Sequence, residues 1–245
     1  ARVRAERGFP ERAEAEIRRA LDLAERSDSP SDRFGGWVQT AFTYIHLRDA
    51  SSTTRCIERA YALGLAERPP FFAILAASYG GWARAMQGEP EPAVAELRPA
   101  IDAYVAMGSH GALSFGFYLG LLAEAELLAG RAVEGLATIE QAIAAAPEER
   151  IYLPELLRLR GELRAACAAD PALVESDLRE AVALAHEMGA RLSELRAAAS
   201  LARQLARHGR AAEGRELLAP LFAAFTEGFA ARDLVEAKAL LDELA

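Results

Sequence analysis

A pattern that recurs about every 40 residues limits what this chain can fold into more than any other feature. Its anchors are Gly8, Arg48, Gly88, Gly130, Ala169 and Gly209, at successive spacings of 40, 40, 42, 39 and 40 residues. Residues of similar size recur at fixed distances after each anchor. A period of this length is typical of proteins built from stacked repeats, in which each unit packs mainly on its neighbours.

The residues that follow each anchor predict a helix with one buried face. Five positions on, the residue is small or short in every repeat (Ala13, Thr53, Ala93, Gly135, Val174, Gly214), and nine positions on it is a large aliphatic (Ile17, Ile57, Leu97, Ile139, Leu178, Leu218). Positions twelve and thirteen on, which include Ala20 and Tyr61, extend the same stripe. These four offsets lie on one side of a helix with 3.6 residues per turn.

A second apolar helix is predicted before each of the last five anchors. These helices are expected at Asp32–Leu47, Pro70–Gln87, Ala112–Ala129, Pro154–Ala168 and Leu192–His208. In the fourth full repeat the small residue Gly161 lies one position out of register, which predicts one extra residue in the turn around Ala169–Asp170. The chain is therefore predicted to be all-α, a single solenoid of antiparallel helix pairs over residues 1–245.

The pattern divides the chain into one partial repeat, five full repeats and a closing helix. The partial repeat covers 1–27, the full repeats cover about 32–65, 70–107, 112–146, 151–188 and 192–227, and the last helix covers 233–244. Asp233, with Glu236 three positions on, matches a capping box that would start this last helix. Residues 1–6 resemble the last turns of a helix whose beginning is absent, so we expect the C-terminal array of a longer protein.

Composition argues against several classes of function. The formal net charge is −8 and the pI is about 5.2, whereas a nucleic-acid-binding domain usually carries a basic excess or stripe. The longest apolar stretches fall short of the ~18 residues that a membrane-spanning helix needs. Cys56 and Cys167 are far apart and belong to no Cys-x-x-Cys pair, as expected of reduced thiols. We therefore expect a soluble cytoplasmic protein that contacts neither nucleic acid nor membrane.

No residue pattern indicates catalysis, a cofactor or a metal site. Lys238 is the only lysine and lies in the last predicted helix, so no phosphate-binding loop is present. The four histidines, at positions 46, 110, 186 and 208, fall in separate repeats. His186–Glu187 lacks the second histidine that a zinc-binding helix requires. We predict that this chain is not an enzyme.

The order Gly, then Ala at +5, an aliphatic at +9 and Ala at +12 resembles the tetratricopeptide repeat (TPR). Trp37 and Tyr44 match aromatic positions of that family's first helix. The family's unit is about 34 residues, and units of about 40 resemble the lengthened form in large bacterial signalling proteins. The resemblance implies a right-handed superhelix whose first helices line a concave groove that holds ligands.

The C-terminal third carries a narrower resemblance. The stretches Tyr152–Leu163, Leu195–Arg210 and Leu217–Leu244 are similar to the C-terminus of bacterial proteins that join a nucleotide-cyclase-like domain, an ATPase domain and a TPR array. Those proteins usually have Asp-Thr after the Glu-Gly-Phe of Glu227–Phe229, where this chain has Ala230 and Ala231. The resemblance implies that any cyclase or ATPase chemistry belongs to other domains of such a protein.

Projecting the family's groove positions onto this chain gives ten candidate partner-binding residues. They are Phe42, His46, Ser78, Trp82, Glu124, Arg158, Glu162, Arg196, Arg203 and Arg207. The N-terminal half of the groove would be aromatic and the C-terminal half rich in arginine, which suits an extended peptide with an acidic end. The alternative is that Phe42 and Trp82 are core residues and the arginines are ordinary solvated surface.

Three functions fit these observations. The first is a regulatory scaffold that binds a protein or peptide, or neighbouring domains of its own chain. The second is a sensor domain that closes around a small-molecule effector, as in large transcription activators. The third is a module for homo-oligomerisation through the apolar surface of the unpaired N-terminal half-repeat.

Overall fold

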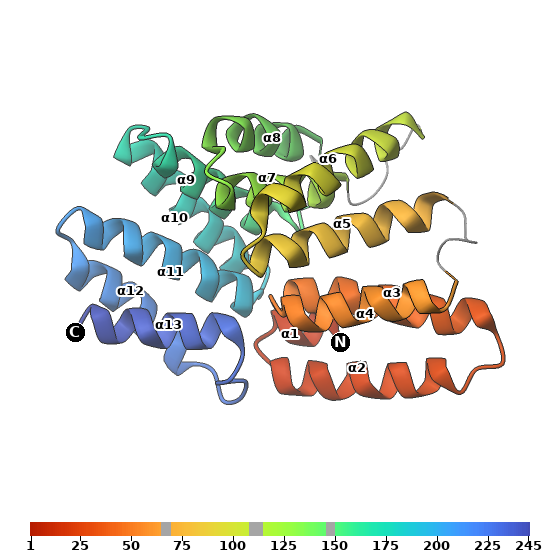
Figure 1. The fold of residues 1–245 in the computed structure, drawn as a ribbon. Helices are drawn as coiled ribbons and strands as arrows, with labels where there is room; N and C mark the ends of the chain where they lie inside the picture. The colour runs from red at the N-terminus through yellow and green to blue at the C-terminus, as the bar shows by residue number, and fades with distance from the viewer. Residues whose placement is uncertain (65–69, 108–114, 146–149) are drawn as a thin grey trace.

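The computed structural model describes residues 1–64, 70–107, 115–145 and 150–245, and in these ranges it contains thirteen helices and no strand. The helices pack one after another along the chain (Figure 1). Their bounds are α1 Arg2–Glu6, α2 Pro10–Glu25, α3 Pro30–His46, α4 Ala50–Ala62, α5 Pro70–Met86, α6 Pro90–Ala106, α7 Phe115–Leu128, α8 Ala132–Ala145, α9 Leu153–Ala166, α10 Pro171–Glu187, α11 Arg191–Arg207, α12 Ala211–Ala223 and α13 Arg232–Glu243. The predicted repeat ends at 65, 112 and 146 lie outside the described residues.

Each odd-numbered helix from α1 to α11 pairs with the helix that follows it, and the turn inside each pair has the same construction. One residue in each turn has a positive φ: Gly8, Arg48, Gly88, Gly130, Ala168 and Gly209. The backbone N–H after it bonds the carbonyl five residues back, as from Asp49 to Tyr44 at 2.9 Å. This Schellman geometry ends one helix and lets the next begin almost at once.

Five of the six anchors occupy this left-handed position, and the remaining turn differs by one residue. The left-handed residue before α10 is Ala168, not the anchor Ala169. Two residues, Ala169 and Asp170, then precede α10, whereas each of the other five turns has one. The turn therefore holds the extra residue that the register shift predicts.

The repeated small and large positions form the contact between helices. All twelve residues at offsets 5 and 9 are buried. Gly135 and Gly214 lie where a methyl group would meet Leu163 and the Ala202 backbone, so these helices approach each other closely. At offsets twelve and thirteen the predicted stripe is buried or half-buried, except at Ala20 and Tyr61, which are exposed.

The first helices of the pairs form a closed inner ring. Helices α1, α3, α5, α7, α9 and α11 each contact the next, and α11 returns to contact α1. In Figure 1 the red N-terminal helices lie beside α13 of the blue C-terminal end. Ser193 of α11 donates a hydrogen bond to Glu6 of α1 at 2.8 Å across this junction. The expected groove is thus closed along much of its length, and α1 packs between α3 and α11 instead of presenting an unpaired face.

The last helix begins differently from the prediction. Helix α13 starts at Arg232 with Ala231 as its N-cap, and no side chain caps it. The Asp233 carboxylate is buried and binds Arg196 of α11, with Nη2 to Oδ2 at 2.6 Å. The predicted Asp233–Glu236 capping box is therefore wrong, because a charged partner on a distant helix outcompetes the local backbone N–H groups.

Two adjacent glycines of α3 test how closely the first pairs pack. A Cβ added at Gly36 would lie 2.5 Å from the Ala24 Cβ of α2, whereas one added at Gly35 would meet nothing within 4 Å. Both substitutions by alanine gain the same helix propensity. We predict that Gly35→Ala raises the free energy of unfolding by about 0.5–1 kcal/mol and that Gly36→Ala lowers it by about 1–3 kcal/mol. Urea denaturation of the two variants beside the parent measures both changes, and equal effects would contradict the packing.

Candidate functional site

Charged side chains from the turn after α3 and from helices α7, α9, α11 and α13 meet inside the ring. Arg48, just after α3, places its Nη2 atom 2.6 Å from Glu124 of α7, and its Nη1 lies 3.6 Å from Glu155 of α9. The Glu124 carboxylate also accepts a hydrogen bond from Trp82 Nε1 of α5 at 2.8 Å. Residues up to 107 positions apart in the sequence thus share one charged contact.

Two further arginines extend this contact to α11 and α13. Arg158 binds Glu155 at 2.6 Å and Glu162 at 2.8 Å, both on its own helix α9. Arg196 binds Glu155 at 3.1 Å and Asp233 at 2.6 Å. We call this set the inner ion-pair network; its members are Arg48, Glu124, Glu155, Arg158, Glu162, Arg196 and Asp233.

Opposite charges hold Glu124, Glu155 and Arg196 of the network in their charged forms. Burial raises the pKa of the Glu155 carboxyl, but the charges of Arg158 and Arg196 outweigh burial and hold that pKa far below its ordinary value of 4.5. Burial acts in the same direction on Glu124, and Arg48 and Arg158 again lower its pKa below 4.5. Burial lowers the pKa of Arg196, but the charges of Asp233 and Glu155 outweigh burial and raise that pKa above its ordinary value. Each charge is therefore stabilised by opposite charges that shared burial brings close.

The backbone of Arg48 explains why an arginine stands at a turn position. Its φ is 55°, in the left-handed region where glycine occupies four of the six equivalent turns. A residue with a side chain is strained there by about 1–2 kcal/mol. The side chain reaches Glu124 and Glu155, so the ion pairs offset this strain.

An aromatic wall lies beside the network. His46 stacks on Phe117 and Tyr152, with ring centroids 5.7 and 6.2 Å apart, and its Nδ1 lies 3.3 Å from Glu6. Phe42 packs edge-on against His46 at 4.9 Å. Between the aromatic wall and the network lies a cavity of about 50 Å³, to which Trp82, Phe117, Glu124 and Arg196 contribute. The cavity has room for only a few water-sized groups.

The ten predicted groove residues separate into two sets. Four of them are buried: Trp82 is 1% exposed, Ser78 donates to the Ile74 carbonyl, and Glu124 and Arg158 bind each other. Trp82 is thus a core residue, as the alternative interpretation holds. His46, Phe42 and Arg196 are largely covered as well. These seven residues are covered or paired within the chain, although Glu124, Arg158 and Arg196 also line a depression, and a partner-contact role for them stays a prediction.

Glu162, Arg203 and Arg207 form the accessible set. Two adjoining depressions of about 360 and 380 Å³ lie where the inner helices end, and both include Glu162 and Arg203. Arg207 lines the first of them and forms no ion pair with any residue that the structure describes. Arg203 is 3.7 Å from Glu236, its ion-pair partner on α13. Leu127 contributes an apolar side chain to the lining of both depressions.

Sequence reasoning missed three members of the network: Arg48, Glu155 and Asp233. Arg48 carried a usable signal, because it replaces glycine at a repeated turn position. Glu155 carries none, since it is one of many acidic residues in an ordinary helical pattern. Asp233 carried a misleading one, the apparent capping box.

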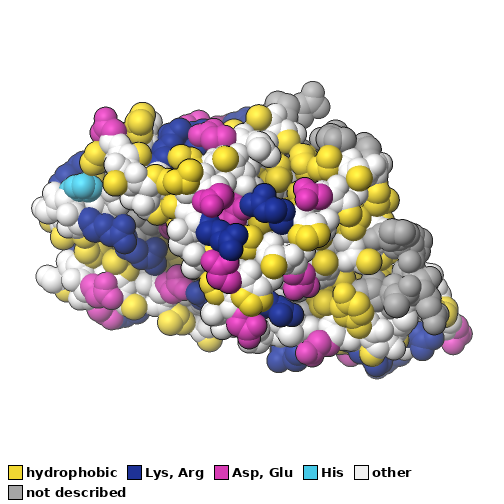
Figure 2. Space-filling model, turned by 45° about the horizontal axis from the view of Figure 1, so that its top comes forward, with side chains coloured by type: hydrophobic (Ala, Val, Ile, Leu, Met, Phe, Trp, Pro, Cys, Tyr) yellow, Lys and Arg dark blue, Asp and Glu magenta, His cyan; other side chains and the backbone are white. Residues whose placement is uncertain are grey.

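The face shown in Figure 2 mixes acidic and basic side chains, with no large area of one sign. Among the described residues there is no group of three or more His, Cys, Asp or Glu side chains placed to hold a metal ion. Within the same residues, no helix is long and apolar enough to span a bilayer. His46, His186 and His208 lie on separate helices or turns, and His110 lies outside the described residues.

No protein-family model matches the sequence, and no curated protein matches it. Among solved structures, the nearly identical TPR-like repeats of a kinesin light chain-like protein from Podosopora anserina superpose with a TM-score of 0.55 and 18% identity, over 80% of this chain and 96% of that one. A single-residue variant of that protein superposes with a TM-score of 0.56 and 18% identity, over 81% of this chain and 96% of the variant. The C-terminal part of a TPR repeat-containing protein from Cytophaga hutchinsonii aligns over 92% and 93% at 15% identity, with a TM-score of 0.35.

The two likenesses with TM-scores of 0.55 and 0.56 show the fold class, a helical-repeat solenoid. More particularly, the chain is an array of TPR-like repeats, in agreement with its helix pairs and their turns. At 18% identity the likeness concerns the fold alone.

The strained turn at Arg48 provides a test of the network. Arg48→Gly relieves the backbone but leaves two buried carboxylates short of a cation, and removing one partner of a buried pair costs about 3–5 kcal/mol. We therefore predict a net destabilisation of about 1–4 kcal/mol after the relief of strain. The matched control is Ala168→Gly, at the other non-glycine left-handed position (φ 53°), which we predict to stabilise by about 1 kcal/mol. Denaturant unfolding of both variants beside the parent measures these changes in the free energy of unfolding. Stabilisation by Arg48→Gly would contradict a structural role for the network.

The lowered pKa values of Glu124 and Glu155 predict acid sensitivity. A carboxyl whose pKa is lower in the folded state stabilises the fold above its unfolded value of 4.5, and that stability is lost as the pH falls below it. We expect the melting temperature to fall as the pH is lowered from 6 toward 3.5, and to fall less in Glu155→Gln.

Glu126 is the opposing control for this titration. Burial raises its pKa, so its ionisation destabilises the fold as the pH rises. Glu126→Gln should therefore make the acid-induced fall in melting temperature steeper. Identical pH profiles for the parent and Glu155→Gln would contradict the charged state of the network.

Proposed function

We propose that this chain is a non-catalytic interaction module that binds a protein segment at the open end of its inner face. The observation that carries the proposal is the pair of adjoining depressions lined by Glu162, Arg203 and Arg207. The first lies near the ends of α9 and α11, and the second also reaches Glu124, Arg158 and Arg196 of the inner ion-pair network. The TPR-like fold supports the proposal because stacked helix pairs create extended binding surfaces.

The chemistry of this end favours an acidic partner. Arg203 and Arg207 are four residues apart on α11, so they lie on the same face of the helix. Guanidinium groups bind carboxylates through two parallel hydrogen bonds. The apolar floor at Leu127 suits an aliphatic side chain beside the acidic group. The proposed ligand is therefore an extended segment of another protein, or of a neighbouring domain, with an acidic end.

The proposal extends to the protein that such a module would serve. The C-terminal stretches from Tyr152 onward resemble bacterial signalling proteins with cyclase-like and ATPase domains, so we place the module at the C-terminal end of a protein of that kind. There it would regulate the attached domains. The cysteines are free, which agrees with the reducing cytoplasm.

A second candidate function is effector sensing, and the aromatic wall favours it. His46, Phe117 and Tyr152 gather around the central cavity together with charged groups, as a small-molecule site would require. At about 50 Å³ the cavity admits only a very small ligand unless the ring opens. A ligand-dependent rise in melting temperature, lost in Phe117→Ala, would favour this function over the first.

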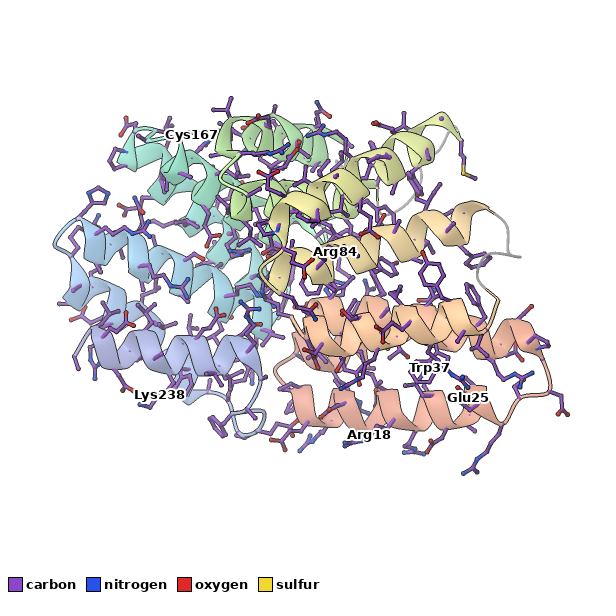
Figure 3. All side chains as sticks on the ribbon, in the orientation of Figure 1. Arg18, Glu25, Trp37, Arg84, Cys167 and Lys238 are labelled. Carbon is purple, nitrogen blue, oxygen red and sulfur yellow. The ribbon has the colours of Figure 1, made fainter. Side chains whose placement is uncertain are left out.

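Charge reversal at the open end tests the proposed function. We predict that Arg203→Glu with Arg207→Glu abolishes capture of acidic partners from the source lysate, because two favourable ion contacts become repulsive. The matched control is Arg18→Glu with Arg19→Glu, exposed residues of α2 with the same change in net charge; Figure 3 shows Arg18 on the outer edge of that helix. The control should capture the partners of the parent. Equal capture by all three proteins would place the interaction elsewhere.

A further inference from the structure

The connection between α12 and α13 packs against the start of α2, more than 200 residues away in the sequence. It includes Glu227–Phe229, the Glu-Gly-Phe that the sequence comparison singles out. The hydrogen bonds from this connection join residues 215 and 217 positions apart. A local sequence pattern thus takes part in the closure of the whole ring.

Two hydrogen bonds run in opposite directions across this junction. The Arg12 backbone N–H donates to Glu227 Oε1 at 3.0 Å, and the Gly228 backbone N–H donates to Glu11 Oε1 at 2.8 Å. The Arg12 side chain adds an ion pair to Glu227 at 3.1 Å. Helix α2 needs this help because its N-cap, Phe9, has no side chain that can accept a backbone N–H. A carboxylate at a helix N-terminus also interacts favourably with the helix dipole.

The arrangement is the long-range equivalent of a capping box. In a capping box one side chain caps the third helical N–H, and a side chain of the first turn bonds back to the capping residue. Here Glu227 caps the N–H of Arg12, the third residue of α2, and Glu11 bonds back to the adjacent Gly228. The two partners lie at opposite ends of the solenoid.

Shape restricts the contact as strictly as hydrogen bonding does. Gly228 has a φ of 79°, and a Cβ added there would collide with the Pro10 ring. Phe225 of the same connection is buried, and its ring edge would lie 3.2 Å from a Cβ added at Gly8. The connection therefore fits the start of α2 in one orientation only.

We propose that this connection is a clasp: the reciprocal bonds of Glu227 and Gly228 with the first turn of α2 hold the two ends of the solenoid together, and breaking them opens the ring. A depression of about 720 Å³ lies beside the clasp and is lined by Pro10, Gly228 and Arg48. Arg48 also belongs to the inner ion-pair network and lines the central cavity, so its side chain separates this depression from the interior. Opening the clasp exposes the network to solvent and widens the inner face.

Distance measurements across the junction test the clasp without any partner. Spin labels at Arg18→Cys on α2 and Lys238→Cys on α13 report the separation of the two ends; both native residues lie on the outside in Figure 3. Cys167→Ser removes the more accessible native thiol. Burial raises the pKa of Cys56 to about 12, which keeps it unreactive. Failure of the clasp and failure of the acidic-partner site are thus separate results.

We expect one narrow distance distribution for the parent and an added population at longer distance for Glu11→Ala with Glu227→Ala. Hydrogen exchange at the Arg12 amide should become roughly tenfold faster, the factor that a lost helix cap produces. The matched control is Glu14→Ala with Glu216→Ala, exposed residues whose carboxylates bond no described residue across the junction. Unchanged helicity by circular dichroism establishes that each variant is folded. A double variant with the parent's distance distribution and exchange rate overturns the proposal.

Discussion

The buried ion pairs at the centre of the ring are the interaction on which the rest of this structure depends. A helical-repeat array needs only contacts between neighbouring units, and the small and large positions of the second helices provide them. The inner ion-pair network adds contacts between units that are not neighbours in the sequence. Arg48, after α3, binds Glu124 of α7 and Glu155 of α9. Arg196 of α11 donates a hydrogen bond to the His46 carbonyl of α3. These contacts hold the successive helix pairs together as a closed ring.

Burying charges does not by itself make a protein more stable than apolar packing would. The loss of hydration is large, and only good geometry with several partners compensates for it. Here each arginine has at least two carboxylate partners, and Trp82 donates to Glu124 as well. What such a network adds is selectivity among arrangements. A ring with one repeat displaced would leave buried charges unpaired, which is far less stable than the observed arrangement.

The sequence predicted what depends on short-range repetition. The period located the helix pairs, the left-handed turns and the extra residue before α10, because each depends on residues within about 15 positions. Ring closure could not be predicted in this way, since Glu227 and Arg12 are 215 positions apart and no periodic signal links them. Asp233 shows the conflict directly: its local pattern fits a cap, whereas its position in space pairs it with Arg196. For the same reason, groove positions projected from open arrays identified residues that this ring buries.

Closure also changes what the arginines of α11 can do. In an open groove, Arg196, Arg203 and Arg207 would form one basic line along the helix. In the closed ring Arg196 is engaged by two carboxylates, Arg203 has a single distant partner, and Arg207 is exposed. The capacity to bind an external carboxylate therefore increases along α11 from the centre of the ring toward its open end. A partner that binds there meets Arg207, which forms no ion pair with any described residue, and in the second depression it would lie beside Arg158 and Arg196 of the network.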